Sequence, residues 1–333
     1  MTDYRSGGVD LAGAERHVEA IRSLVTATWG ANIVGGFGGF AAGIELPEGM
    51  RRPVLMMSTD GVGTKLDIAR RLGIWDGVGH DLVAMCVDDL TAVGARPLGF
   101  VDYMAVGSLD AERDTRVVAS IAAACSEAGA ALVGGETAEH PGVMEHDAID
   151  LAGAALGVVE AGDEIVGEAV QAGDLVVGLA SRNIRSNGFS LVRRVLDGAD
   201  WSEPFDGSTL AETVLQPSVL YSRSVLAAMR TGGVTGAAHI TGGGLPGNLS
   251  RPIPEGLSAH IESSTWRVPP IFEYLQEMGD INRVAMFEAF NMGVGFCLIV
   301  RPDRLSEVVA PVAAHDPAVI GEIVDGPEGV RIS

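Results

Sequence analysis

The sequence holds one lysine among 333 residues, Lys65, which closes the segment Asp60-Gly61-Val62-Gly63-Thr64-Lys65. The other basic residues are 22 arginines, since lysine and arginine together number 23. A lysine ammonium is a compact point charge that suits phosphate oxygens, and flexible glycines let backbone N–H groups approach an anion. The segment is therefore typical of a nucleotide or phosphate-ester site. On spacing alone, a surface lysine after a tight turn is an equal alternative.

Three carboxylates stand where ligands gather in α/β proteins. Asp60 ends an apolar run over 54–59 that predicts a buried strand, and Glu136 follows a short strand over 131–133 in a Gly-Gly-Glu turn. Asp89 lies on a helix predicted over 80–93. Three oxygen donors beside glycine turns favour a site for divalent ions that bridge phosphates. The alternative is that each acid caps a nearby helix.

Asp88 and Asp89 are separated by their places on a helical wheel. The apolar face of the predicted helix holds Leu82, Cys86, Leu90 and Val93. Asp89 falls at the edge of this face and Asp88 points well away, so we predict that Asp88 is solvated and that Asp89 is the site residue. A carboxylate turned toward a core is costly unless it is paired or binds a metal. For Asp89 a buried salt bridge or a backbone cap is the alternative.

Three further segments are candidates for binding an anion or a substrate. The first is a glycine-rich run with Gly35, Gly36, Gly38 and Gly39; the second is Arg185-Ser186-Asn187; the third is Thr241-Gly242-Gly243-Gly244. None matches a Walker A or dinucleotide fingerprint. Taken alone, the first segment favours a flexible loop over a binding site. The second is equally a helix cap, and the third is a fair anion-binding turn but a poor fingerprint.

Composition excludes several classes of protein. The net charge of −21 and a pI of about 4.6 argue against nucleic acid as a partner, which requires a basic face. Cys86, Cys125 and Cys297 lie far apart in apolar stretches, so we predict core positions rather than a zinc site or disulfides. No segment reads as a signal peptide or a membrane span. We therefore expect a cytoplasmic protein without a membrane partner.

Strand-like and helix-like segments alternate along the chain, which predicts an α/β protein. The length favours two domains, and the composition changes over 160–172. We place an N-terminal domain at 1–165 and a C-terminal domain at 166–333. Helices are predicted over 15–28, 66–72, 80–93, from Ser108 to Gly129, over 189–196 and from Pro217; strands are predicted over 54–59, 98–106, 131–133, 151–159, 175–180, 237–240, 294–300 and 319–324.

Seven segments together resemble the phosphoribosylformylglycinamidine cyclo-ligases, also called aminoimidazole ribonucleotide synthetases. They read GGFGGF over 35–40, STDGVGTK over 58–65, DLVAMCVDDL over 81–90, LVGGETAE over 132–139, SNG over 186–188, HITGGG over 239–244 and FNMGVG over 290–295. No single segment is decisive. The ordered set covers nearly the whole chain and is highly specific.

The resemblance implies ATP-dependent ring closure of formylglycinamidine ribonucleotide to aminoimidazole ribonucleotide, with release of ADP and phosphate. It implies that Asp60 and Asp89 bind Mg²⁺, with Glu136 on the metal or the nucleotide and K⁺ as a further candidate ion. Lys65, Gly61, Gly63, Thr64 and the 35–40 loop would cover phosphates, and Asp60, Lys65, Asp89 and Asn187 would be catalytic. Arg185, Ser186, Asn187 and Thr241–Gly244 would bind substrate. The family fold implies a homodimer whose N-terminal sheets pair into a barrel, each subunit with a C-terminal α/β domain; we accordingly expect the N-terminal domain to bind ATP and metal and the C-terminal domain to bind substrate.

Arg185 departs from this pattern, because many members of the family read His-Ser-Asn-Gly where this chain reads Arg185-Ser186-Asn187-Gly188. An arginine does not deprotonate in a protein, so it is not a proton carrier. We favour the interpretation that the position is not an essential base. A thiamine-phosphate kinase of the same fold and a non-catalytic ATP-binding regulator are the alternative functions.

Overall fold

A computed structural model describes residues 11–327 and 329–333, and the chain forms two compact units. Over the described residues, unit 1 comprises 11–87 and Pro97–Glu160, and unit 2 comprises Asp88–Arg96, 161–327 and 329–333. The division after Glu160 falls in the region where the composition changes. The short segment 88–96 belongs to unit 2, which no pattern in the sequence indicated.

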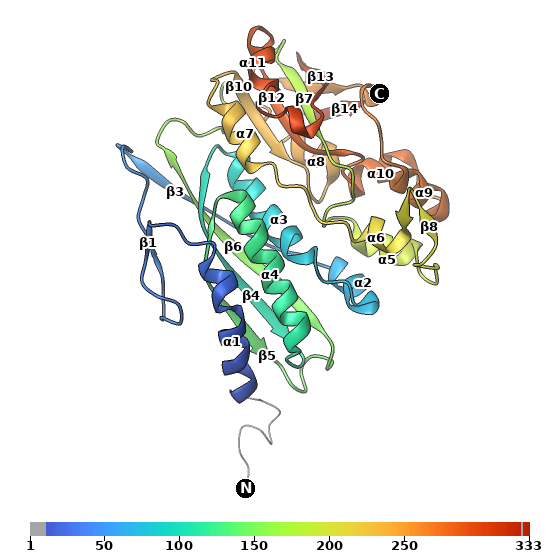
Figure 1. Ribbon diagram of the computed structural model, residues 1–333. Coiled ribbons are helices and arrows are strands. Elements are labelled where there is room, and N and C mark those ends of the chain that lie inside the picture. The colour runs from blue at the N-terminus through green and yellow to red at the C-terminus, as the bar shows by residue number, and fades with distance from the viewer. Residues whose placement is uncertain (1–10, 328) are drawn as a thin grey trace. The chain divides into compact units, whose positions relative to one another are not determined.

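Unit 1 is a four-stranded sheet with helices on one face (Figure 1). Its strand order is β3-β6-β4-β5, in which β3 and β6 are antiparallel and β4 and β5 are parallel. Helices α1 and α4 pack on each other and both contact β5. A small hairpin of β1 and β2 carries the glycine-rich loop. The elements are α1 (Leu11–Thr26), β1 (Ile33–Val34), β2 (Gly43–Ile44), β3 (Pro53–Gly61), α2 (Lys65–Leu72), α3 (Val78–Ala92, whose last residues belong to unit 2), β4 (Arg96–Val106), α4 (Ala111–Ala128), β5 (Ala131–Glu139) and β6 (Ile149–Glu160).

Unit 2 is built on a six-stranded sheet with the order β10-β12-β7-β13-β11-β14. Its ladders are antiparallel except for β11 with β14. The elements are β7 (Leu175–Ala180), α5 (Phe189–Val195), β8 (Pro204–Phe205), β9 (Ser208–Thr209), α6 (Leu210–Val214), α7 (Ser222–Met229), β10 (Val234–His239), α8 (Gly244–Leu249), β11 (Leu257–Ile261), η2 (Ser263–Thr265), α9 (Pro270–Gly279), α10 (Arg283–Ala289), β12 (Val294–Val300), η3 (Pro302–Arg304), α11 (Leu305–Val309), η4 (Ala313–His315), β13 (Ala318–Asp325) and β14 (Gly329–Ile332).

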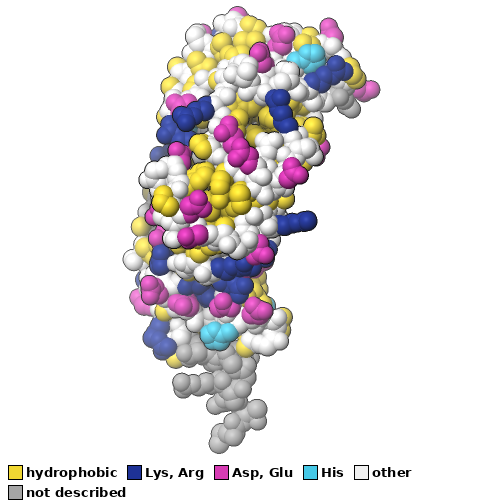
Figure 2. Space-filling model, turned by 90° about the vertical axis from the view of Figure 1, so that its right-hand side faces the viewer, with side chains coloured by type: hydrophobic (Ala, Val, Ile, Leu, Met, Phe, Trp, Pro, Cys, Tyr) yellow, Lys and Arg dark blue, Asp and Glu magenta, His cyan; other side chains and the backbone are white. Residues whose placement is uncertain are grey.

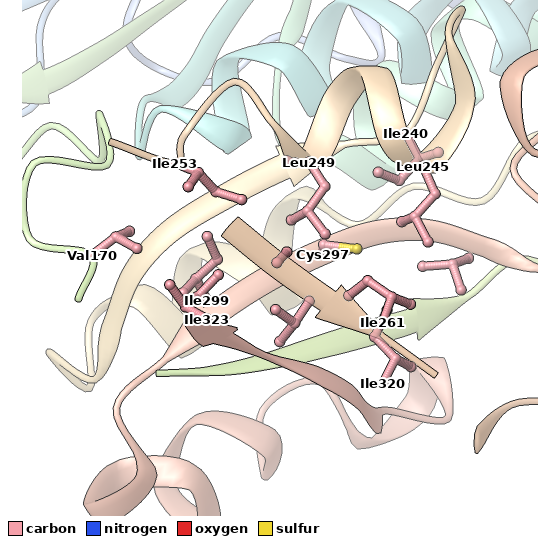
Figure 3. Close-up of a cluster of buried hydrophobic side chains, with 14 residues drawn as sticks. Val170, Ile240, Leu245, Leu249, Ile253, Ile261, Cys297, Ile299, Ile320 and Ile323 are labelled. Atoms are coloured by element: carbon pink, nitrogen blue, oxygen red, sulfur yellow. The ribbon is translucent and has the colours of Figure 1, made fainter. Parts of the chain in front are cut away.

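Both faces of this sheet are buried. Val176 belongs to a cluster that includes Leu245 and Leu249 of α8 (Figure 3), whereas its neighbour Val177 packs with Val225 of α7 on the opposite face. Successive side chains of a strand point to opposite faces, so a sheet covered on both sides needs apolar residues at every position. This explains the continuous apolar runs of β7 and β12, which the sequence placed at their observed bounds.

Several predicted boundaries are wrong. Helix α1 begins at Leu11 rather than at residue 15, and strand β10 begins at Val234 rather than at residue 237. Helix α4 is capped by Asp110, whose carboxylate accepts from the N–H groups of Glu112 and Arg113, and not by Ser108. Strand β5 runs on through the Gly-Gly-Glu segment to Glu139, because this stretch pairs with β4. Helix α7 begins at Ser222 rather than near Pro217.

The surface and the cysteines agree with the composition. Acidic and basic side chains are interspersed on the face shown in Figure 2. Cys86, Cys125 and Cys297 are buried and in no disulfide, and burial raises the pKa of the Cys125 and Cys297 thiols, so these residues pack as predicted. Among the described residues, no helix has the length and apolar content that a membrane crossing requires.

Asp102 of β4 gives unit 1 a pH-dependent stability. Desolvation raises the pKa of its carboxyl to about 7, against 3.8 for an ordinary aspartate. The folded state then keeps a proton that the unfolded state loses, so stability falls as the pH rises from about 4 to about 7. We expect Asp102→Asn to raise the free energy of unfolding at pH 8 by roughly 1–3 kcal/mol and to flatten this dependence. Urea unfolding at pH 5 and pH 8 measures it; an equal pH dependence in both proteins would contradict the desolvation of this carboxyl.

Candidate functional site

The last residues of β3 present Asp60 to solvent. Asp60 is exposed, and its Oδ1 accepts the N–H of Gly61 at 2.7 Å, which fixes the carboxylate beside the glycine turn. Gly63 has a φ of 70°, a conformation that favours glycine. Helix α2 then begins at Lys65 and ends at Gly73, which adopts the left-handed conformation common at helix ends. The predicted strand, turn and helix are all present, but the prediction of a buried strand is wrong. Leu55 and Met57 of β3 are 53% and 75% exposed, because one face of this strand is not covered by other parts of the described chain.

Lys65 is buried, which neither interpretation of the sequence anticipated. Its side chain has no exposed surface, and its Nζ lies 2.6 Å from Oδ2 of Asp81, which is equally buried. The surface-lysine alternative is therefore wrong. The ammonium is held against a carboxylate at the start of α3, and this contact ties the turn of Asp60 to that helix.

Glu136 and the glycine-rich loop are both accessible. Glu136 is exposed and lies within β5, opposite Tyr103 of β4, rather than in a turn after a strand as we predicted. Gly35 and Gly38 have φ angles of 107° and 84° and shape the loop between β1 and β2. The guanidinium of Arg22 lies 4.6 Å from the ring centre of Phe37 in this loop. A cation over an aromatic face is a favourable contact, so α1 helps to hold the loop.

In unit 2, Asp88 has a buried partner. The Nη2 of Arg185 donates to Oδ2 of Asp88 at 2.9 Å, and the two side chains are 1% and 0% exposed. Oδ1 of Asp88 accepts the N–H of Tyr221 at 3.1 Å. The prediction of a solvated Asp88 is wrong, because residues 81–88 are all buried and the helix offers no solvated face there.

Asp89 is half-buried and contacts a histidine that the sequence did not single out. Its carboxylate is 44% exposed, and Oδ1 lies 2.9 Å from Nδ1 of His239. Nε2 of the same ring lies 3.0 Å from Nη2 of Arg185. A signal for His239 existed in the sequence: it ends the apolar strand β10, and a polar ring in a buried strand requires partners.

The predicted substrate segments lie close together. A Cβ built on Gly242 would come within 3.5 Å of Oδ1 of Asn187. The turn Thr241–Gly244 is held by Asn248, whose amide donates to the carbonyl oxygens of Thr241, Gly242 and Gly244 at 2.8–3.2 Å.

Neither Ser186 nor Asn187 caps helix α5, so the capping alternative is wrong. Helix α5 begins after Gly188 and has no side-chain cap bond. The hydroxyl of Ser186 is buried and has no hydrogen-bond partner among the described residues. A buried polar atom without a partner calls for a ligand or a water molecule.

No group of three or more His, Cys, Asp or Glu side chains in the described parts of the chain is close enough to hold a metal ion. Neither unit, over its described residues, therefore holds a preassembled cage of such side chains. Mg²⁺ seldom uses such a cage, because it is usually bound by one or two carboxylates together with water and substrate phosphates.

Unit 2 also contains an open cavity of about 550 Å³ that none of the predicted site residues line. Arg182 and Asp316 on its wall are exposed and form an ion pair of 2.9 Å. Its walls are completed by Gly178, Ala180, Ser181, Asp206, Trp266, Arg267, Pro269, Pro270, Gly293, Val294, Ala318 and Ile320.

Comparison with known proteins defines the class. Residues 41–159 match the N-terminal domain, and residues 171–333 the C-terminal domain, of AIR synthase related proteins. Among solved structures, a thiamine-monophosphate kinase from Stenotrophomonas maltophilia superposes with a TM-score of 0.68 over 94% of this chain and 96% of its own, at 19% identity. A hydrogenase maturation protein HypE solved with ATP gives the same TM-score and identity over 94% and 90%. At this identity the likeness shows a shared two-domain fold.

Curated relatives narrow the class. A phosphoribosylformylglycinamidine cyclo-ligase from Thermosynechococcus vestitus is 47% identical over 90% of this chain and 89% of its own length. Another, from Picosynechococcus, is 43% identical over 97% of both chains. The chain belongs to the phosphoribosylformylglycinamidine cyclo-ligase family.

Proposed function

We propose that this chain closes the imidazole ring of aminoimidazole ribonucleotide from formylglycinamidine ribonucleotide and ATP. The observation that carries the proposal is the match to cyclo-ligases over nearly the full length at 47% and 43% identity. The structure adds that Asp60, Asp89 and Glu136 all reach solvent, so these oxygen donors are accessible to a ligand.

The chemistry requires activation of a poor electrophile. The formamide oxygen attacks the γ-phosphorus of ATP, and ADP leaves. The amidine nitrogen then attacks the formyl carbon, and the C–O bond breaks to release phosphate. Such a reaction depends on positioning and charge neutralisation more than on covalent catalysis by the protein.

Carboxylates of this chain fit a hard divalent cation that phosphates help to bind. We assign Asp60 and Asp89 to Mg²⁺ and Glu136 to the metal or the nucleotide; bound Mg²⁺ would neutralise the triphosphate charge. The 35–40 loop and the turn of Gly61, Gly63 and Thr64 would cover phosphates. Lys65 shapes this turn through Asp81, and its phosphate contact stays a prediction. K⁺ dependence is part of the proposal, and replacing K⁺ by Na⁺ in the assay tests it.

Substrate is assigned to the segments that meet around Asn187. The buried, unpartnered hydroxyl of Ser186 and the turn at Thr241–Gly244 offer polar groups to a ribonucleotide. Arg185, which we had expected to bind substrate, faces Asp88 and His239 instead. Residues 1–165 would thus bind ATP and metal, and residues 166–333 would bind substrate.

A mass-balanced assay tests the function. Protein, Mg-ATP and formylglycinamidine ribonucleotide are mixed, and aminoimidazole ribonucleotide and ADP are followed together. We expect both to form in equal amounts. ATP that is bound but not consumed would favour the regulator, and thiamine phosphate would be the next substrate to test. The three buried free thiols fit the reducing cytoplasm that we propose as its compartment.

We also propose that the chain forms a homodimer through its N-terminal sheet. On the sheet face turned away from the helices of unit 1, Leu55 and Met57 of β3 and Val101 and Tyr103 of β4 are 41–75% exposed. An apolar row of this kind is typical of an interaction surface.

Met57→Glu tests the dimer. Met57 is 75% exposed, and a carboxylate at this position would have to be desolvated in a sheet-to-sheet interface. We expect the variant to sediment as a monomer at concentrations at which the wild type is a dimer. Met278→Glu, which introduces the same change at a 57% exposed position of α9, is the matched control. If Met57→Glu and Met278→Glu both remained dimeric, the interface would lie elsewhere on the chain.

A further inference from the structure

Arg185 is held in an unusual backbone conformation. Its φ is 65°, in the left-handed region that a residue with a Cβ adopts at a cost of roughly 1–3 kcal/mol. Oδ1 of Asn183 accepts its N–H at 3.2 Å, and the amide of Asn291 donates to the carbonyl oxygens of Asn183 and Ile184 at 2.9 and 3.1 Å. These contacts stabilise the loop and direct the guanidinium inward, where it also lies 5.0 Å from the ring centre of Tyr221.

The positive charge of Arg185 is compensated by the adjacent carboxylate of Asp88. Burial by itself lowers the pKa of the guanidinium, but the adjacent Asp88 outweighs this and the net shift is upward. The same Nη2 has a second hydrogen, and it lies 3.0 Å from Nε2 of His239, within hydrogen-bond distance. Asp88 therefore anchors an arginine that also contacts a histidine ring.

Hydrogen-bond direction then fixes the ring. A guanidinium can only donate, so Nε2 of His239 must accept and carries no proton. Nδ1 is the nitrogen that bears hydrogen, and it donates to Oδ1 of Asp89 at 2.9 Å. A histidine at position 185 could donate or accept, so it would not impose this order. The arginine of this chain imposes it.

We propose that Arg185 is a positioning residue, which sets the Nδ1–H tautomer of His239 and through it orients the Asp89 carboxylate that receives Mg-ATP. The inference rests on the proposed function for the role of Asp89. It gives Arg185 a task that requires neither proton transfer nor contact with substrate. Removing a residue that orients a metal ligand through hydrogen bonds lowers metal affinity or activity about 10- to 100-fold.

The test uses the full chain labelled with ¹⁵N-histidine, with His239→Gln to assign the resonance. Two variants are compared: Arg185→Lys, which keeps a donor and a charge, and Arg185→Met combined with Asp88→Asn, which leaves no unpaired buried charge. Mn²⁺-ATP binding is followed by electron paramagnetic resonance, and KM for Mg-ATP is separated from kcat.

We expect the wild type and Arg185→Lys to show the Nδ1–H form and to bind Mn²⁺-ATP within a few-fold of each other. The double variant should lose the single tautomer and bind Mn²⁺-ATP about 10- to 100-fold more weakly. Three results would each overturn the inference. They are a wild-type His239 ring protonated on Nε2, an unchanged tautomer in the double variant, and an altered tautomer with unchanged Mn²⁺-ATP binding. If the ring and Mn²⁺-ATP respond as expected while the wild type makes no aminoimidazole ribonucleotide, the proposed function fails and the positioning role stands.

Discussion

Lys65→Met is expected to lower the free energy of unfolding of unit 1 by about 3–5 kcal/mol, because it leaves the carboxylate of Asp81 buried without its cation. Both side chains of this pair are fully buried, and the ammonium lies 2.6 Å from the carboxylate. Replacing both members should cost far less, since the penalty belongs to the unpaired charge. We expect Lys65→Met with Asp81→Asn to recover most of the loss.

Urea unfolding followed by hydrogen exchange of peptides from α2 and α3 restricts the measurement to unit 1. Arg71→Met in the same helix is the matched control: it removes a cation that lies 2.9 Å from Asp67 but is 54% exposed. An exposed pair of this kind contributes at most about 1 kcal/mol. If Lys65→Met cost no more than Arg71→Met, the ammonium would not be buried against Asp81, and the phosphate contact would become the better account of this lysine.

Lys65 also shows where sequence reasoning stops. The strand, the glycine turn and the helix around it follow from local patterns, and all three are present. Whether the side chain faces a ligand or a buried carboxylate depends on α3, which packs against the turn only in the folded chain. Local pattern predicted the position of the residue but not its partner.

Asp88 and Asp89 make the same point more sharply. The helical wheel assumed one buried face, but α3 is buried over residues 81–88, so a position off the apolar stripe is not a solvated one. A buried acid must be paired, and the partner of Asp88 is Arg185, 97 residues along the chain. No periodicity or spacing in the sequence connects them. The substitution that set this chain apart from its family is thereby explained as half of an ion pair.

The two segments that we assign to substrate share a physical property. The 186–187 and 241–244 segments each join a buried strand to a helix, so strand register fixes their location before any ligand is considered. Glu136 lacks such a constraint. Its Gly-Gly-Glu segment reads as a turn from composition, yet the chain continues as a strand because β4 offers a parallel partner.

Asp89→Asn is expected to lower kcat/KM at least 100-fold while the fold is unchanged. Asparagine has the same shape, and its carbonyl oxygen still accepts the hydrogen bond that Nδ1 of His239 donates to Oδ1 at 2.9 Å. What the change removes is a negative charge on a carboxylate that is 44% exposed, so little stability depends on it. A magnesium ligand, in contrast, loses most of its attraction for the cation when it becomes an amide.

The comparison that decides the role of Asp89 is with Asp200→Asn, which neutralises an exposed carboxylate that only accepts hydrogen bonds from Ser202. Aminoimidazole ribonucleotide formation is measured for both variants over a range of Mg²⁺ concentrations, and circular dichroism checks the fold. We expect the control to match the wild type and Asp89→Asn to stay inactive at saturating Mg²⁺. Partial recovery at high Mg²⁺ would mean that the charge mainly sets metal affinity. Full activity at ordinary Mg²⁺ would remove Asp89 from the metal site. The hydrogen bonds that link Arg185, His239 and Asp89 would then serve the stability of unit 2 alone.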